Sequence, residues 1–319
     1  MEAHKNTFTL GDELKYSIVI PVYNSQNVVE NVVEILLDVI NKNGFSAEII
    51  LVNDGSSDSS WDVIKQLAND FKNVKSIDLV KNYGQHNAIL CGFKYATGDY
   101  IITMDDDLQN PPSEIIHLIN KMNEGNYDLV FGKFREKKDA LYRKFGSSFI
   151  GYLNTKIFNK PKNITLTNFR IVRRDLIDRV LLHKTSYPYI PGMLLMYASS
   201  ICNTEVEHHR RSEGVSNYTF KKILSLMSRL LINYSSYPLR LLSTIGLVIA
   251  VLSLFSGLYY LVYGLIVGSE VPGWTTLIVL ISFLGGFIIA LLGVIGEYLS
   301  RILDQISSEH SYFVRELVE

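Results

Sequence analysis

The sequence has little cysteine and almost no net charge, and both shortages narrow what the protein can be. Its two cysteines, Cys91 and Cys202, lie far apart in a chain of 319 residues. This spacing argues against a disulfide framework and suits a reducing compartment. The formal net charge is −1, so the overall charge gives no reason to expect nucleic acid as a partner.

Two familiar phosphate-binding loops are also missing. No Gly-x-Gly-x-x-Gly follows the first strand predicted below, and no Gly-Lys-Ser/Thr element occurs in the chain. Because these loops bind phosphates through backbone amides, their absence disfavours a dehydrogenase-type dinucleotide site and a P-loop nucleotide-binding site. A bound diphosphate would instead need a metal ion and basic side chains.

Charged residues are missing from two long stretches near the C-terminus. Asp, Glu, Lys, Arg and His are absent from residues 241–269 and again from residues 271–296. Each stretch exceeds the roughly 20 apolar residues that span a bilayer. A buried hairpin of a soluble protein is the alternative, but soluble core helices are rarely apolar on every face. We therefore predict two transmembrane helices, over about 241–267 and 274–296.

The positions of basic residues predict how these helices are oriented. The connector over residues 268–273 carries no Lys or Arg. The basic residues that flank the two stretches are Lys221, Lys222, Arg229, Arg240, Arg301 and Arg315. The positive-inside rule then predicts a multi-pass protein of the inner (cytoplasmic) membrane with both termini in the cytoplasm. Residues 1–15 lack the apolar segment of a signal peptide.

Two further patterns describe the predicted membrane part. Apolar residues recur at helical spacing before the first span, which predicts an amphipathic interface helix over residues 219–239. Small residues form one face of the second span, where they permit close helix packing within the hairpin or between subunits, and we expect a homo-oligomer. These small residues are Gly285, Gly286, Gly293 and Gly296.

The first two hundred residues alternate between strand and helix patterns. The predicted strands cover residues 16–22, 47–53, 75–80, 100–104 and 129–131, with helices between them. Such alternation predicts right-handed crossovers and a doubly wound, mostly parallel α/β sheet. We therefore expect a cytoplasmic catalytic domain over residues 1–218, the interface helix, a membrane hairpin over 240–298 and a C-terminal tail over 299–319.

The fourth predicted strand ends in three consecutive acids, Asp105, Asp106 and Asp107. Adjacent carboxylates repel one another and resist burial, and a divalent cation would relieve that repulsion. Mg²⁺ and Mn²⁺ prefer such oxygen ligands and commonly bridge carboxylates to phosphates. A solvated acidic turn is the alternative. The cation site is favoured because polar residues also end the other strands, where ligands of parallel sheets bind.

Several motifs in order resemble one enzyme family. Residues 17–24 (Ser-Ile-Val-Ile-Pro-Val-Tyr-Asn), 52–58 (Val-Asn-Asp-Gly-Ser-Ser-Asp) and 104–112 (Met-Asp-Asp-Asp-Leu-Gln-Asn-Pro-Pro) resemble family 2 glycosyltransferases of the GT-A fold. The Asp-Leu-Gln-Asn-Pro-Pro element and the two C-terminal spans are similar to the polyprenyl-phosphate glycosyltransferases. That group includes dolichol-phosphate mannose synthase and the undecaprenyl-phosphate glucosyltransferases. Residues 82–86, 208–218 and 238–240 are similar to its undecaprenyl-phosphate formamido-arabinose transferase branch.

The resemblance implies roles for individual residues. It implies Mg²⁺ or Mn²⁺ bound by Asp105, Asp107 and Gln109, with Asp105, Asp107 and Arg211 as the catalytic set. The residues expected to hold the nucleotide sugar are Pro21, Tyr23, Asn24, Asp54, Gly84, Asp106 and Lys133. Weaker candidates for contacting the acceptor phosphate are Arg143, Arg170, Arg210 and Ser216. Asp106 replaces a residue that is usually small, which leaves open whether it faces the ribose or solvent.

The implied reaction is an inverting transfer of a sugar from a nucleoside diphosphate, UDP being expected, to undecaprenyl phosphate. The cation would stabilise the leaving diphosphate. The phosphate nucleophile is largely ionised at neutral pH, so positioning matters more than a catalytic base, although Asp106 could serve as one. The product would be a lipid-linked monosaccharide for envelope glycan modification.

Two alternatives remain at this point. A processive polysaccharide synthase would carry a Gln-x-x-Arg-Trp element and more spans, but neither Trp61 nor Trp274 follows an arginine. A catalytically silent, membrane-anchored nucleotide-sugar binder is disfavoured by the intact acidic motif and Arg211. The sugar stays open among an amino-arabinose, glucose, N-acetylglucosamine or another UDP-linked sugar.

Overall fold

A computed structural model describes residues 15–134, 141–207, 231, 233–235, 237–267, 273–307 and 311–319. The chain forms two compact units. The first, the sheet unit, comprises Met1–Asn217 together with Ser308–Glu319, and the second, the helical unit, comprises Tyr218–Ser307. The last residues of the chain therefore belong to the same unit as the first two hundred.

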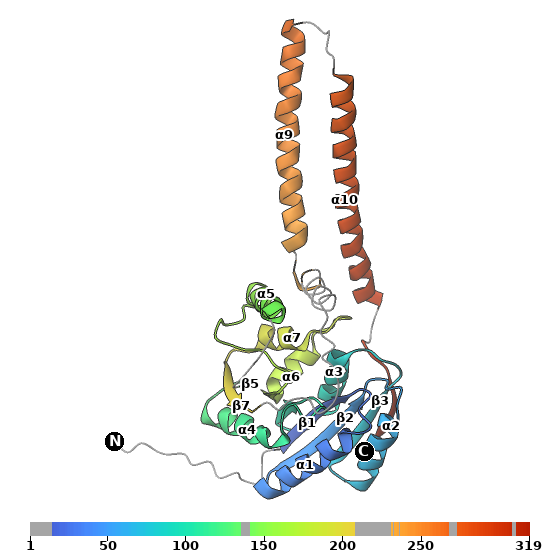
Figure 1. Ribbon diagram of the computed structural model, residues 1–319, viewed down its shortest axis with the longest axis vertical. Coiled ribbons are helices and arrows are strands. Elements are labelled where there is room, and N and C mark those ends of the chain that lie inside the picture. The colour runs from blue at the N-terminus through green and yellow to red at the C-terminus, as the bar shows by residue number, and fades with distance from the viewer. Residues whose placement is uncertain are drawn as a thin grey trace, which may run out of the picture. The chain divides into compact units, whose positions relative to one another are not determined.

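The sheet unit is built on an eight-stranded sheet with the order β7-β5-β6-β4-β1-β2-β3-β8 (Figure 1). The strands are β1 Lys15–Val22, β2 Ser46–Asn53, β3 Val74–Leu79, β4 Tyr100–Thr103, β5 Leu129–Phe134, β6 Arg170–Arg173, β7 Ile201–Val206 and β8 Val314–Val318. In this described sheet only β6 and β8 pair antiparallel with their neighbours. The predicted α/β sheet is confirmed as a mixed sheet whose central strands β4, β1, β2 and β3 are parallel.

The central strands are buried on both faces, which explains their continuous apolar sequences. Along β1, Ile18 and Ile20 belong to one core cluster, whereas Val19 belongs to the other. This division follows from the alternation of side chains along a strand. The first cluster includes residues of α1 Val29–Asn43, α2 Ser60–Asp70 and α4 Ile115–Glu124. The second includes residues of α3 Gln85–Tyr95, α6 Arg174–Leu181 and α7 Ile190–Tyr197.

Three strands were not predicted from the sequence. The four-residue β6 lies between β4 and β5, and β7 forms one edge of the sheet. At the other edge lies β8, within the segment 299–319 for which we expected a separate tail. Between β4 and α4, Pro112–Glu114 forms a short 3₁₀-helix that begins with a proline, a residue favoured in the first turn of helices. Helix α5 spans Leu141–Phe158.

The helical unit contains two long helices, α9 Tyr237–Val267 and α10 Trp274–Ser307. In the part of the chain that the structure describes, one segment, Phe283–Ser300, has the length and apolar composition of a membrane span. Helix α10 continues to Ser307, beyond the span predicted to end at residue 296. The predicted interface helix over 219–239 lies mostly outside the described residues. The two membrane crossings therefore stay a prediction.

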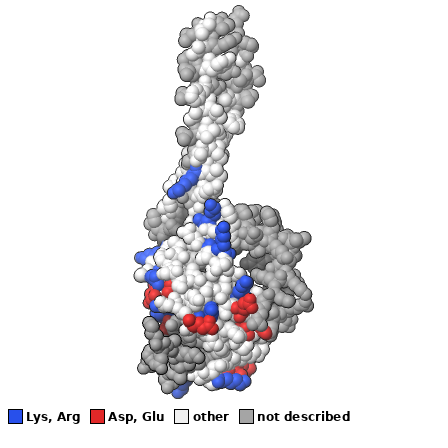
Figure 2. Space-filling view, turned by 90° about the vertical axis from the view of Figure 1, so that its left-hand side faces the viewer, with Lys and Arg blue, Asp and Glu red and all other residues white. Residues whose placement is uncertain are grey.

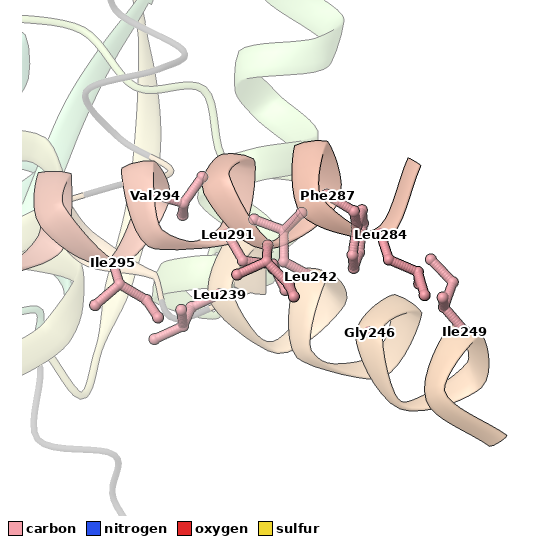
Figure 3. A pocket seen from close by; sticks show the side chains of 10 residues that line it. Leu239, Leu242, Gly246, Ile249, Leu284, Phe287, Leu291, Val294 and Ile295 are labelled. Carbon is pink, nitrogen blue, oxygen red and sulfur yellow. The ribbon is translucent and has the colours of Figure 1, made fainter. Parts of the chain in front are cut away.

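The surfaces of the two units differ in charge. On the face drawn in Figure 2, charged side chains are rare among the described residues of the helical unit, whereas both basic and acidic side chains are present on the sheet unit. Between α9 and α10 lies an apolar groove lined by leucine, isoleucine, valine and phenylalanine side chains (Figure 3).

Candidate active site

The parallel register brings polar residues from four neighbouring strands to one edge of the sheet. Strands β4, β1, β2 and β3 lie side by side, and their carboxyl ends lead into Met104–Asp107, Tyr23–Asn24, Asn53–Asp54 and Asp78 respectively. The predicted convergence of these segments is therefore present. It places the acidic run of β4 beside the loop that follows β1.

Asp105 is half-buried and accepts two hydrogen bonds. Gln85 Nε2 donates to its Oδ1 atom at 2.6 Å, and Asn168 Nδ2 donates to the same atom at 3.4 Å. Burial, together with the charges of Asp107 and Asp106, raises the pKa of Asp105 to about 6, although the two amide donors oppose this rise. A carboxylate that is destabilised in this way gains most from a nearby cation.

Asp106 faces the loop that follows β1. Its Oδ2 atom accepts hydrogen bonds from Ser25 Oγ at 2.5 Å and from the Tyr23 amide at 3.3 Å. Burial raises the pKa of Asp106, and these bonds partly offset the rise. The carboxylate thus ties the acidic run to the β1 loop. A contact with the nucleotide sugar stays a prediction.

The next residues form a strained turn. Leu108 has φ of +56°, a left-handed conformation that is uncommon for a branched side chain and typical of functional loops. The Gln109 amide donates to Asp107 Oδ1 at 3.1 Å, which fixes the turn. No three His, Cys, Asp or Glu side chains gather around one point in the described residues. A cation here would thus take few protein ligands, and the mutual repulsion at half-buried Asp105 fits such a cation.

Asp54 is buried and shapes the loop between β3 and α3. Its carboxylate accepts hydrogen bonds from the amides of Tyr83, at 2.7 Å, and Gly84, at 2.9 Å. Burial raises the pKa of Asp54, and these amides lower it. Gly84 has φ of +91°, a conformation that side chains disfavour. Asp54 was expected to bind the nucleotide base; in the structure its oxygens contact backbone amides, so its direct contact with a base stays a prediction.

The β1 end offers an exposed ring above a fixed loop. Pro21 is buried in the strand, whereas Tyr23 is 50% exposed. Asn24 adopts φ of +52°, and its Oδ1 atom accepts a hydrogen bond from the Ser57 amide at 2.9 Å. This bond joins the loops that follow β1 and β2. The exposed Tyr23 ring has the freedom needed to stack against a planar group.

Arg170 is the largest fully buried side chain in the described chain. Its Nη1 atom donates to the Thr167 carbonyl at 3.3 Å, but Nε and Nη2 have no partner among the described residues. Burial lowers the pKa of Arg170 to about 10, while the charge of Asp105 raises it. Because a buried guanidinium with unused donors is costly, this site is suited to an incoming anion.

The remaining predicted residues lie on β5, on α5 or outside the described residues. Lys133 lies near the carboxyl end of β5 and is exposed. Arg143 belongs to α5, but its side chain lies outside the described part. Arg210, Arg211 and Ser216 also lie outside the described residues. Their roles stay predictions.

Sequence reasoning missed three side chains that contact the acids. Gln85 and Asn168 donate to Asp105, and Ser25 donates to Asp106. Gln85 stands within the motif 82–86, so the resemblance gave a signal for it. Asn168 lies 63 residues from Asp105 in the sequence, so no local pattern links the two. Ser25 gave no signal, because serine is common in turns.

Comparison with known proteins identifies the class. A sequence model described as glycosyl transferase family 2 matches residues 17–181. The chain belongs to this family and is a glycosyltransferase. It shares 16% identity and a TM-score of 0.51 with the crystal structure of glucosyl-3-phosphoglycerate synthase from Mycobacterium tuberculosis in complex with phosphoglyceric acid, covering 72% of this chain and 84% of that one. That likeness supports the GT-A-type mixed α/β fold.

More similar sequences carry a more specific name. The undecaprenyl-phosphate 4-deoxy-4-formamido-L-arabinose transferase of Proteus mirabilis (strain HI4320) is 37% identical over 308 residues, which cover 95% of this chain and 94% of that protein. The protein of the same name from Photorhabdus laumondii is 35% identical over 307 residues, with the same coverage. The resemblance to this branch, drawn first from short motifs, thus extends over nearly the whole chain.

Proposed function

We propose that the protein transfers a sugar, with inversion, from a UDP-sugar to undecaprenyl phosphate at the cytoplasmic face of the inner membrane. One observation supports this most strongly. The half-buried acid Asp105 and the fully buried Arg170 lie at the same edge of the sheet, where the charge of Asp105 raises the pKa of Arg170. Arg170 also has N–H donors without a partner among the described residues. The acids suit a cation on the leaving diphosphate, and the guanidinium suits the phosphate of the acceptor.

In this proposal Asp105, Asp107 and Gln109 hold Mg²⁺ or Mn²⁺. The bound cation would supply positive charge to the departing diphosphate. Gln85 and Asn168 orient the Asp105 carboxylate through the bonds described above. Asp106 fixes the acidic run against the β1 loop through Ser25. The M. tuberculosis synthase has been crystallised with Mn²⁺ and UDP, with a TM-score of 0.50 and 16% identity over 69% of this chain and 77% of that one.

The nucleotide would lie against the loops that follow β1, β2 and β3. Tyr23 offers an exposed ring for the base, and Asn24 and Asp54 hold the surrounding loops in place. Gly84 leaves the backbone accessible because it has no side chain. Lys133 is the exposed basic residue that we assign to the nucleotide sugar at the β5 end.

Arg170 is our candidate for binding the acceptor phosphate. Its two unused donors can form a bidentate bond with phosphate oxygens. Because the phosphate is already largely ionised at neutral pH, the protein needs to position it rather than deprotonate it. We assign Arg143, Arg210, Arg211 and Ser216 to the same phosphates, with Arg211 gripping the diphosphate or the acceptor.

The long helices would anchor the enzyme in the membrane where its lipid acceptor resides. We propose that α9 and α10 cross the bilayer and that residues 219–239 lie at its surface. Side chains built at Gly285, Gly286, Gly293 and Gly296 would meet no atom of the described chain within 4 Å. These glycines therefore make no close contact with the described part of α9, and we assign them to packing between subunits of a homo-oligomer.

A transfer assay on the purified full-length protein tests the proposal. The protein, in detergent micelles with Mn²⁺, is given undecaprenyl phosphate and a panel of UDP-sugars that includes UDP-4-deoxy-4-formamido-L-arabinose, the sugar named for the relatives. We expect one lipid-linked monosaccharide. Undecaprenol, which lacks the phosphate, is the matched control and should give no product.

The same assay separates the other candidate functions. Products longer than a monosaccharide would indicate a processive synthase. UDP-sugar binding without turnover, for every sugar in the panel, would indicate a silent binder. A glycosylated product formed without any lipid phosphate would contradict the proposed acceptor.

A further inference from the structure

The strand at the end of the chain pairs irregularly with the sheet. Strand β8 lies antiparallel beside β3 (Figure 1), with Asp78 opposite Glu316 and Leu79 opposite Val314. Arg315 is therefore an extra residue between two paired positions, which is a β-bulge. Bulges redirect a side chain and are frequent next to active sites. Here the bulge directs Arg315 to the carboxyl end of β3.

The Arg315 guanidinium binds two groups at that end. Its Nη1 atom donates to Asp78 Oδ2 at 2.9 Å, and its Nη2 atom donates to the Val80 carbonyl at 2.6 Å. The Asp78 side chain is 2% exposed, and a polar group buried to this extent needs hydrogen-bond partners within the protein. The Val80 amide donates to the Phe313 carbonyl at 3.0 Å. Arg315 thus holds both the end of β3 and the first residue of the following loop.

That loop, residues 80–84, forms one wall of the donor site. The amides of Tyr83 and Gly84 bind Asp54, and the next residue, Gln85, donates to Asp105. The loop also packs closely on Gly55, where a Cβ atom would lie 2.4 Å from the Asn82 nitrogen. A shift of Val80 would therefore be passed to residues that surround the nucleotide.

A second path runs from Asp78 across the sheet. Asn53 Nδ2 donates to Asp78 Oδ1 at 2.7 Å, and Asn53 Oδ1 accepts a bond from the Ser56 amide at 3.2 Å. Ser56 Oγ in turn accepts a bond from the Asn24 amide at 3.0 Å. This chain of bonds reaches the β1 loop. Arg315 therefore supports both loops that we assign to the nucleotide.

We infer that Arg315 is a positioning residue for nucleotide binding and that β8 is a working part of the donor site. This inference rests on the proposed function, because it takes UDP as the ligand. A strand that only covered the sheet edge would need its backbone bonds but no arginine at the bulge. The donor site would thus be completed by residues that follow the second long helix in the chain.

The test is UDP binding by the full-length protein in detergent micelles, measured by titration calorimetry with Mn²⁺ present. We expect Arg315→Gln to raise the Kd for UDP about tenfold, because a buried carboxylate loses its charged partner. The number of sites and kcat at saturating donor should change little. Glu316→Gln is the matched control: it lies on the same strand, pairs with the half-buried Lys65 on α2, and should leave the Kd unchanged.

A second substitution separates positioning from general stability. Asp78→Asn in the Arg315→Gln background removes the uncompensated charge, and we expect it to restore most of the UDP affinity.

Equal Kd values for Arg315→Gln and Glu316→Gln would overturn the inference. So would fewer sites with an unchanged Kd, since partial unfolding has that effect. If Arg315→Gln does not fold, Arg315→Lys replaces it, and a wild-type Kd would then overturn the inference. Failure of the unaltered protein to bind UDP would instead contradict the proposed function.

Discussion

Glu48, at the amino end of the sheet, and the acids of the candidate site, at its carboxyl end, differ in how well the protein stabilises their charges. At the amino end, Glu48 is 4% exposed and accepts hydrogen bonds from Ser17 Oγ at 2.6 Å, the Thr97 amide at 2.6 Å and Thr97 Oγ1 at 2.7 Å. The Lys75 Nζ atom lies 3.4 Å from Glu48 Oε2. Burial raises the pKa of Glu48, but these partners together hold it below its usual value. At the carboxyl end, the pKa values of Asp105, Asp106 and Asp54 are all raised.

Two arginines that flank β6 show the same contrast. Because β6 runs antiparallel to β4, its last residue lies at the amino end of the sheet and its first residue, Arg170, lies at the carboxyl end. Arg174, which follows the last residue of β6, donates from Nε and Nη2 to the Gly98 carbonyl at 2.9 and 2.7 Å. Arg170, at the carboxyl end, leaves Nε and Nη2 without partners in the described chain. The amino-end acid and arginine are thus satisfied by the protein itself, whereas at the carboxyl end Arg170 has donors with no partner among the described residues and the pKa values of three acids are raised. Such incomplete sites are where function is expected.

The strongest test of this contrast removes one acid from the carboxyl end. Asp107→Asn should lower the rate of sugar transfer at least about 100-fold, because the leaving diphosphate loses the charge that the cation supplies. Initial rates with labelled UDP-sugar measure the effect. Asp38→Asn is the control, because Asp38 forms an exposed pair with Lys42 on α1. Near-normal transfer by Asp107→Asn would rule out its metal role.

The two arginines of the β6 region provide the next test. Arg170→Gln should raise the KM for undecaprenyl phosphate about tenfold or more while leaving UDP affinity unchanged, because a charged hydrogen bond to phosphate is lost. Its melting temperature should not fall, since the buried charge is incompletely paired in the protein. Arg174→Gln should do the reverse, lowering the melting temperature without changing this KM. A lower melting temperature for Arg170→Gln with an unchanged KM would make Arg170 a structural residue.

The sequence alone predicted the central strands because they are buried on both faces and read as apolar runs. It also placed the acids at the end of β4. Strand β6 escaped detection because it has only four residues and arginine at both ends. The partners of Asp105 are Gln85, on α3, and Asn168, and the fold brings both of them to the end of β4. Such non-local contacts cannot be read from local patterns.

The C-terminal strand was missed for a related reason. Its side chains alternate between half-buried and exposed, as at a sheet edge, and Arg315 lies 237 residues from its partner Asp78 in the sequence. In the sequence, Arg315 counted only as one of the basic residues that follow the second span. Its bulged position next to a buried acid gives it a second role that only the pairing of β8 with β3 reveals.

The smallest effect on activity is expected at the amino end, where Glu48→Gln tests the other half of the comparison. Because the folded protein holds the Glu48 pKa below its ordinary value, the carboxylate stabilises the fold above about pH 4.5, and this contribution is lost as the pH falls through the folded pKa. Glu48→Gln should lower the free energy of unfolding at pH 7 by about 2 kcal/mol. Its stability should also depend less on pH below about 4.5.

Urea unfolding of the full-length protein between pH 3 and 7 would measure this difference, with Asp38→Asn as a control on an exposed pair. The KM values for donor and acceptor should stay at those of the unaltered protein, because Glu48 lies at the end of the sheet away from the acids. A change in UDP affinity without a change in stability would mean that the two ends are coupled through the strands. The sheet would then not divide into a self-sufficient end and a ligand-dependent end.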